Sequence, residues 1–161
     1  MLPIGERRFT VRGREVTHWF VDSPKVACII PVLPDGRILL ERQYRAALDS
    51  WILELPAGKA EPGEEVEACA RRELEEETGF RAGRLQELFW FWPAPGYSNE
   101  EIHLFVARDL RDGERSLDPG EELEVEALTV EEFLDAVEAG RIHDGKTLLA
   151  AAHLRCHGLS G

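Results

Sequence analysis

The sequence lacks any run of apolar residues long enough to cross a membrane, and its opening residues, MLPIGERRFT, lack the apolar core of a signal peptide. It also has little cysteine: Cys28, Cys69 and Cys156 are far apart and odd in number. That spacing excludes a disulfide framework and a cysteine zinc site. We therefore expect a cytoplasmic protein in which Cys69 is a small core residue.

Basic charge is scarce as well. The chain has 19 lysines and arginines against 31 aspartates and glutamates, a formal net charge of −12. This balance argues against general binding to nucleic acid or to anionic lipid, both of which need a basic surface. An anionic substrate would need bound cations or a local arginine cluster. The length of 161 residues suggests one domain with a sizeable core, and we find no internal repeat or low-complexity segment.

The stretch GKAEPGEEVEACARRELEEETGF, from Gly58 to Phe80, reads as a loop followed by a helix. The helix is predicted to begin near Gly63–Glu64, just after Pro62, and to end at Gly79. At about 100° per residue, one apolar stripe should face the core. Its members are Val66, Cys69, Ala70 and Leu74.

Three carboxylates conflict with that helix. Glu73 and Glu77 fall inside the apolar stripe, and Glu76 lies on its edge. They repel one another at the i,i+3 and i,i+4 spacings, and they stand near the end where the helix dipole disfavours anions. A divalent cation such as Mg²⁺, which prefers carboxylate oxygens, would resolve these conflicts. A solvated acidic helix is the alternative, and it suits Glu75, which we take as a surface residue.

The same stretch resembles the signature of the Nudix hydrolases: Gly, five residues, Glu, seven residues, then Arg-Glu-apolar-x-Glu-Glu-x-Gly-apolar. Every fixed position matches, namely Gly58, Glu64, Arg72, Glu73, Leu74, Glu76, Glu77, Gly79 and Phe80. The resemblance implies an α/β/α sandwich with a mixed sheet and hydrolysis of a nucleoside diphosphate linked to another moiety. It also implies a set of metal ligands for Mg²⁺, with Mn²⁺ or another divalent cation possible. They are Glu73, Glu76, Glu77 and the carbonyl of Ala57.

Finer features resemble the ADP-ribose pyrophosphatase branch of that family. They are ERQYR (Glu41 to Arg45), the lead-in ELPAG that begins at Glu54, and a proline in PAPGYSNE, Pro95. By this resemblance Arg45 holds the diphosphate, and Glu54 and the Pro95 loop help to place the substrate.

Two kinds of side chain are expected to assist the reaction. Arg72, beside Glu73, is expected to orient the carboxylates by ion pairing, and Glu77 is expected to act in catalysis as well as in metal binding. By the same resemblance, a glutamate from a late loop acts as catalytic base. Glu121 is the best-aligned candidate, its neighbour Glu122 is the other, and a solvated acidic strand end is the alternative.

The N-terminal residues Arg7 to Asp22 read as two strands around the turn Arg12-Gly13-Arg14. Members of the branch are commonly homodimers joined through such strands. We therefore divide the chain into residues 1–24, a dimerisation element, and residues 25–161, the hydrolase domain. In a homodimer Trp19 or Phe20 could reach a neighbour's nucleotide pocket, although core packing is the alternative for Trp19.

The other elements follow from periodicity and turn signals. Strands are predicted at Lys25–Leu33 (buried on both faces), Arg37–Arg45, Trp51–Leu55, Leu88–Trp92, Glu101–Arg108 and Glu121–Leu128. The strand Leu88–Trp92 is either a central core strand or the wall of a pocket that stacks a flat ring. A capping box at Thr129 opens a helix that ends near Gly140, and a last helix starts at Asp144 or Thr147. These elements together predict an α/β protein with a mixed sheet between helices.

The leading expectation for function is Mg²⁺-dependent hydrolysis of ADP-ribose to AMP and ribose 5-phosphate. The runner-up is hydrolysis of another nucleoside diphosphate derivative: a sugar nucleotide, a dinucleotide or a coenzyme. A non-catalytic nucleotide-sensing module of the same fold is a third possibility. Such a module would be expected to lose signature carboxylates, and all three are present here.

Overall fold

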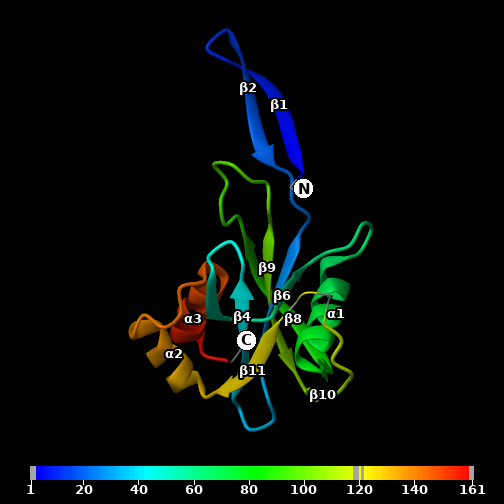
Figure 1. Ribbon diagram of the computed structural model, residues 1–161, viewed down its shortest axis with the longest axis vertical. Helices are drawn as coiled ribbons and strands as arrows, with labels where there is room; N and C mark the ends of the chain where they lie inside the picture. The colour runs from blue at the N-terminus through cyan, green and yellow to red at the C-terminus, as the bar shows by residue number, and fades with distance from the viewer. Residues whose placement is uncertain (1–2, 118–119, 121, 160–161) are drawn as a thin grey trace.

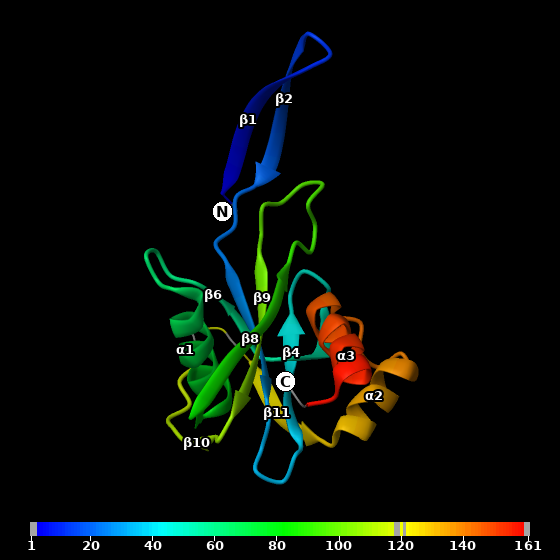
Figure 2. The same cartoon turned by 180° about the vertical axis from the view of Figure 1, so that it is seen from behind.

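The computed structural model describes residues 3–117, 120 and 122–159. Two sheets lie between helices: α1 covers one side, and α2 and α3 cover the other (Figures 1 and 2). The strands are β1 (Ile4–Val11), β2 (Arg14–Val21), β3 (Val26–Pro31), β4 (Ile38–Arg45), β5 (Ser50–Glu54), β6 (Ala57–Lys59), β7 (Phe80–Arg81), β8 (Arg84–Phe91), β9 (Ile102–Arg108), β10 (Arg111–Asp112) and β11 (Leu123–Leu128). The helices are α1 (Val66–Thr78), α2 (Val130–Glu138) and α3 (Gly145–His157).

The larger of the two central sheets is mixed. Its four strands have the order β6-β3-β9-β8, in which β3 and β9 are parallel and the other pairs are antiparallel. The second sheet, β11-β4-β5, is antiparallel throughout. One core cluster packs against α2 and α3 and another against α1. The expected α/β sandwich with a mixed sheet is confirmed.

The strands of the larger sheet differ in burial. All six residues of β3 are buried, as its continuous apolar sequence predicts. The expectation of a central core strand at Leu88–Trp92 is wrong, because within the described part of the chain β8 stands at the edge of its sheet, beside β9. Trp90 on this strand is 46% exposed. An aromatic run alone therefore did not distinguish an edge strand from a buried one.

The helix ends follow their capping residues. α1 begins at Val66, slightly later than predicted, with Glu65 as N-cap, and ends at Gly79 with φ of 77°. That left-handed backbone is the reason for glycine at the C-cap. The capping box of Thr129 and Glu132 opens α2, and Asp144 caps α3, both as expected. Of the helices described, none is both long and apolar enough to span a membrane.

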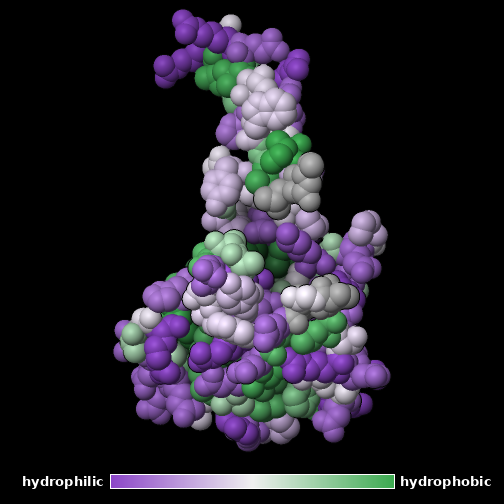
Figure 3. Space-filling model, in the orientation of Figure 1, coloured by the Kyte–Doolittle hydropathy of each residue, from purple (hydrophilic) through white to green (hydrophobic). Residues whose placement is uncertain are grey.

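Strands β1 and β2 form a hairpin that stands off the body of the molecule (Figures 1 and 3). Side chains on both faces of this hairpin are exposed, and Trp19 is 60% exposed, so core packing of Trp19 is wrong. The base is attached by the backbone, since Val21 N donates to Tyr97 O at 2.8 Å. The hairpin therefore presents apolar side chains that the rest of its own chain does not cover.

Candidate active site

The carboxylate of Glu73 lies against the backbone of Gly58. A Cβ placed on Gly58 would be 1.9 Å from Cδ of Glu73, so only glycine allows this approach. Cys69, Ala70 and Leu74 of α1 are buried in the core on the same helix. The apolar stripe thus docks α1 onto the sheet and brings Glu73 to β6.

Arg72 gathers the carboxylates on this side of α1. Its guanidinium donates to Glu73 at 2.7 Å and to Glu76 at 2.8 Å. It also donates to both oxygens of Glu64, at 3.0 and 2.9 Å. The hydrogen bonds from Arg72 hold the pKa of Glu64 below its usual value, and the bond to Glu64 is the largest contribution raising the pKa of Arg72. Arg72 therefore ties the loop before α1 to two of the predicted metal ligands.

Glu77 is the most buried of the three predicted ligands. Its side chain points at the sheet, where Oε2 accepts a hydrogen bond from Ala57 N at 3.0 Å, and the residue is 3% exposed. Glu75 faces elsewhere and pairs with Arg81 at 2.7 Å; that hydrogen bond lowers the pKa of the Glu75 carboxyl. The structure thus places Glu73 and Glu77 on the Ala57–Gly58 side of the helix and separates Glu75 from them.

The donor atoms at this place suit a hard cation. Carboxylate and backbone carbonyl oxygens are the ligands that Mg²⁺ accepts, and Glu73 and Glu77 bring such oxygens to the Ala57–Gly58 backbone. Among the residues that the structure describes, no three acidic, histidine or cysteine side chains are already arranged around one point. A cation would therefore compete with Arg72 for the carboxylates of Glu73 and Glu76.

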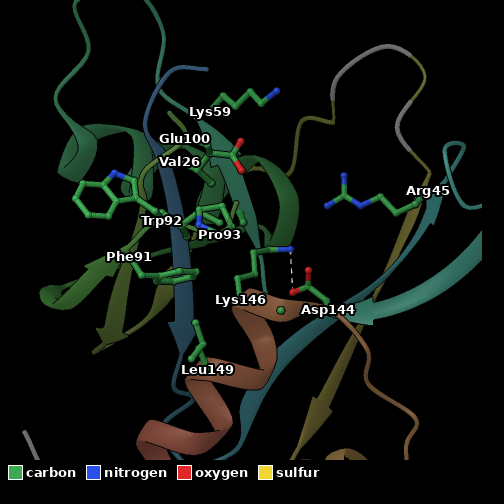
Figure 4. A pocket seen from close by; sticks show the side chains of 14 residues that line it. Val26, Arg45, Lys59, Phe91, Trp92, Pro93, Glu100, Asp144, Lys146 and Leu149 are labelled. Carbon is green, nitrogen blue, oxygen red and sulfur yellow. Dashed lines mark ion pairs between the residues drawn. The ribbon is translucent and has the colours of Figure 1, made fainter. Parts of the chain in front are cut away.

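A pocket of about 470 Å³ opens beside Ala57 and Gly58. Phe91, Trp92 and Pro93 lie on one side of it, and Arg45 lies on the other (Figure 4). The remaining lining residues are Val26, Lys59, Glu100, Ile102, Asp144, Gly145, Lys146 and Leu149. The pocket therefore joins an apolar side, a cationic side and the backbone beside the α1 carboxylates.

The cationic side is organised around Glu54, which is 1% exposed. Arg45 donates to its two oxygens at 2.7 and 2.8 Å, and Lys146 forms a second ion pair with it. Lys146 also lies 3.1 Å from Asp144. Burial by itself would lower the pKa of Lys146, but the charges of Glu54 and Asp144 outweigh burial and raise it. Lys146 therefore carries its positive charge at neutral pH.

Lys146 is a site residue that sequence reasoning missed. It lies at the start of α3, next to the cap residue Asp144, where the helix dipole disfavours a cation. That conflict was the one local signal in the sequence. Of the two predicted substrate residues on this side, Arg45 lines the pocket and Glu54 does not, although Glu54 pairs with both Arg45 and Lys146.

Other predicted residues lie away from this pocket. Pro95 and Phe20 line a separate cavity of about 450 Å³ between the hairpin and the loop after β8, and Trp19 lines neither. Glu121 lies outside the described residues. Glu122 is exposed, and its backbone carbonyl accepts a hydrogen bond from Tyr44 N at 3.4 Å.

Comparisons with known proteins agree with this geometry. A family model described as the NUDIX domain matches residues 22–152. The ADP-ribose pyrophosphatase of Bacillus subtilis (strain 168) is 38% identical over 145 residues, which cover 89% of this chain and 78% of that protein. The GDP-mannose pyrophosphatase of Cronobacter sakazakii is 36% identical over 132 residues, with coverage of 76% and 68%. A crystal structure of an ADP compounds hydrolase superposes with a TM-score of 0.83 at 25% identity, covering 96% of this chain and 85% of that one.

Proposed function

Because this chain belongs to the NUDIX domain family, a family of hydrolases, we propose that it cleaves the diphosphate bond of ADP-ribose with the help of Mg²⁺. The products are AMP and ribose 5-phosphate, and one water is consumed. Another divalent cation, such as Mn²⁺, could replace Mg²⁺.

One observation carries this proposal: the α1 carboxylates and the cationic pocket share the backbone of Ala57 and Gly58. Glu73 and Glu77 approach that backbone from the helix side. Ala57 and Gly58 themselves line the pocket, together with Arg45 and Lys146. A diphosphate in the pocket would therefore have cationic side chains on one flank and the carboxylate cluster on the other.

The residues divide the chemistry among them. Bound Mg²⁺ would neutralise phosphate charge and lower the pKa of a water molecule. Glu73, Glu76, Glu77 and the Ala57 carbonyl would hold the ion, and Arg72 orients the first two. Arg45 and Lys146 would bind phosphate oxygens, which also answers the problem of an anionic substrate in a protein of net charge −12. Glu121 or Glu122 would accept the proton from the attacking water.

The identity of the group linked to the diphosphate is the finer part of the proposal. The Bacillus subtilis relative supports ADP-ribose. The apolar side of the pocket, with Phe91 and Trp92, offers flat faces on which a ring can stack. A sugar nucleotide is the second candidate, because the Cronobacter sakazakii relative is a GDP-mannose pyrophosphatase. A dinucleotide or a coenzyme is a further alternative in the same class.

We further propose that the protein is a cytoplasmic homodimer that does not bind nucleic acid. The exposed hairpin β1–β2, with Trp19 on its surface, supports pairing with a second copy. Trp19 or Phe20 would then reach the partner's nucleotide pocket. The excess of acidic residues supports the proposal that nucleic acid is not a partner.

A substrate panel tests the proposal. The protein is incubated with Mg²⁺ and, separately, ADP-ribose, GDP-mannose and a dinucleotide, and nucleotide products are measured by chromatography. We expect AMP from ADP-ribose at the highest kcat/KM. A higher kcat/KM for GDP-mannose would favour the second candidate. No release from any substrate would favour the non-catalytic nucleotide-sensing module.

A pair of variants tests the metal site itself. Glu77→Gln removes the charge of a predicted ligand and should lower kcat by at least about 100-fold, the upper range for loss of a group that supports a metal. Glu75→Gln is the matched control on the same helix and should change kcat by less than about threefold, because Glu75 pairs with Arg81 away from the pocket. Near wild-type activity of Glu77→Gln would disprove the proposed metal site.

A further inference from the structure

The C-terminal end of α1 carries negative charge where the helix dipole is already negative. Glu75, Glu76 and Glu77 lie in its last residues, and no basic residue lies in its last turn. Carbonyl oxygens at such an end need donors from elsewhere in the chain. The source of those donors therefore bears on how the predicted metal ligands are held.

The donors come from residues 113–116, which cover the end of α1. Gly113 N donates to Gly79 O at 2.7 Å, and Ser116 N donates to Glu76 O at 3.0 Å. Between them, Nε of Arg115 donates to Glu77 O at 2.8 Å. The guanidinium of Arg115 thus supplies the positive charge that α1 lacks in its own last turn.

Arg115 also contacts the second central sheet. Its Nη2 donates to Leu123 O at 2.7 Å, and Leu123 is the first residue of β11. Leu123 pairs with Gln43 of β4, so this carbonyl belongs to the rigid sheet rather than to a loop. One guanidinium therefore bridges the backbone of Glu77 and the start of β11.

The connection continues through Glu77 to the pocket. The backbone of Glu77 is held by Arg115, and its carboxylate accepts the hydrogen bond from Ala57 N. We propose that Arg115 is a positioning residue, which fixes Glu77 and Ala57 relative to β11 without contacting substrate. This inference rests on the metal site of the proposed function, and it adds a residue outside both the signature and the pocket lining.

The geometry predicts an effect on metal binding and turnover rather than on packing. Arg115 is exposed, so its truncation removes no part of the core. Small displacements of catalytic groups are costly, because reacting atoms must be held within fractions of an ångström. Substrate affinity should be less sensitive, since Arg115 does not line the pocket that contains Arg45 and Lys146.

The test compares Arg115→Ala with Arg81→Ala. Arg81 of β7 lies just after the same end of α1, and its side chain pairs with Glu75 rather than with Glu77 or β11. For Arg115→Ala we expect Mn²⁺ affinity, measured by electron paramagnetic resonance, and kcat to fall by about 10- to 100-fold, as for other groups that orient metal ligands. KM should stay within about twofold and Arg81→Ala should resemble the wild type in each measurement.

Two further measurements separate positioning from general damage. Millimolar guanidinium should partly restore kcat and Mn²⁺ affinity in Arg115→Ala. If the substitution merely destabilised the protein, added guanidinium would not restore either quantity. Arg115→Lys, whose single ammonium cannot bridge both carbonyls, should be intermediate. If Arg115→Ala fails to fold, Mn²⁺ affinity and kcat are compared between Arg115→Lys and Arg81→Ala, and a loss confined to Arg115→Lys supports the inference.

The inference is overturned if the Arg115 variants bind Mn²⁺ and turn over like the wild type. It is also overturned if Arg81→Ala shows the same loss, or if guanidinium restores neither measurement in folded Arg115→Ala. Failure of the proposed function is distinguishable, because the wild type would then not hydrolyse ADP-ribose. The Mn²⁺ measurement would still compare the variants.

Discussion

Gly58 occupies a position where no side chain fits, because a Cβ there would overlap the carboxylate of Glu73. The adjacent residue Ala57 receives the carboxylate of Glu77 on its N–H. Two of the predicted metal ligands therefore approach the backbone of two adjacent residues, Ala57 and Gly58. At the scale of one residue, the site requires the glycine at position 58 as well as the carboxylates of Glu73 and Glu77.

Gly58→Ala should therefore separate activity from stability. The added methyl group must displace Glu73, whose carboxylate is the flexible end of its side chain and can turn away. We expect kcat to fall by about 10- to 100-fold, as when a metal ligand loses its orientation, while the thermal midpoint changes by only a few degrees. Wild-type kcat in this variant would show that the position of Glu73 does not matter.

Lys146 is the second residue whose substitution has a clear expected outcome. It is 9% exposed and pairs with Glu54, which is 1% exposed. Lys146→Met leaves Glu54 with Arg45 alone, and breaking a buried pair costs about 3 kcal/mol or more of unfolding free energy. Lys25→Met is the control, because its pair with Glu101 is exposed and should contribute less than about 1 kcal/mol. Urea denaturation measures the unfolding free energy of both variants. Equal losses of unfolding free energy in Lys146→Met and Lys25→Met would contradict this role of Lys146.

At the scale of elements, α3 links the pocket to the far end of the fold. Asp144 caps the helix and Lys146 lies in its first turn, while His153 and His157 lie toward its end, with their rings 4.7 Å apart. Burial lowers the pKa of His153, and the neighbouring His157 lowers it further. The folded state therefore favours the neutral ring of His153.

This shift predicts how stability depends on pH. The folded pKa of His153 lies below the unfolded value of about 6.5, so in that region the unfolded state binds more protons than the folded state. The contribution of His153 is fully present above that value and is lost as the pH falls toward the folded pKa. His153→Asn should reduce the loss of unfolding free energy between about pH 7 and pH 5. Identical pH profiles for the variant and the wild type would contradict the assignment.

Elements whose structure is determined by a local sequence pattern could be predicted from the sequence. The apolar run of β3, the stripe of α1, the capping box at Thr129 and the turn at Gly79 each determine one structure by short-range physics. The position of β8 could not be predicted, because whether a strand is central or at the edge depends on distant strands. The start of α1 was misplaced because Glu64 and Glu65 suit either side of the boundary.

The candidate site shows the same division. The α1 carboxylates conflict with their own helix, so the sequence revealed them. Lys146 and Arg115 reach their partners only through the tertiary fold: Lys146 is 92 residues from Glu54, and Arg115 is 38 residues from Glu77. The late-loop base predicted at Glu121 stays a prediction, and so does the division of the chain after residue 24.

At the scale of the whole molecule, the hairpin β1–β2 leaves apolar side chains exposed on both faces. Ile4, Phe9 and Trp19 are 59%, 44% and 60% exposed. A two-stranded hairpin alone is marginally stable, so a partner surface would stabilise it. This arrangement suits a hairpin that is completed by a second copy of the chain.

The mass in solution tests that arrangement. Multi-angle light scattering should give twice the chain mass of 18.2 kDa for the wild type. Trp19→Glu should shift the population toward the monomer, because it places a charge in the proposed interface. If Trp19 reaches the partner's pocket, the variant should also raise KM for ADP-ribose. A monomeric wild type would contradict the proposed homodimer.

The parallel pairing of β3 with β9 has a consequence for synthesis on the ribosome. Ile29 of β3 lies beside Phe105 of β9, so until that later strand has been made, β3 can pair only with β6. The second sheet is completed later still, because β4 pairs with β11, which begins at Leu123. The acidic helix α1 is therefore synthesised before the strand β9, which completes the sheet that receives it.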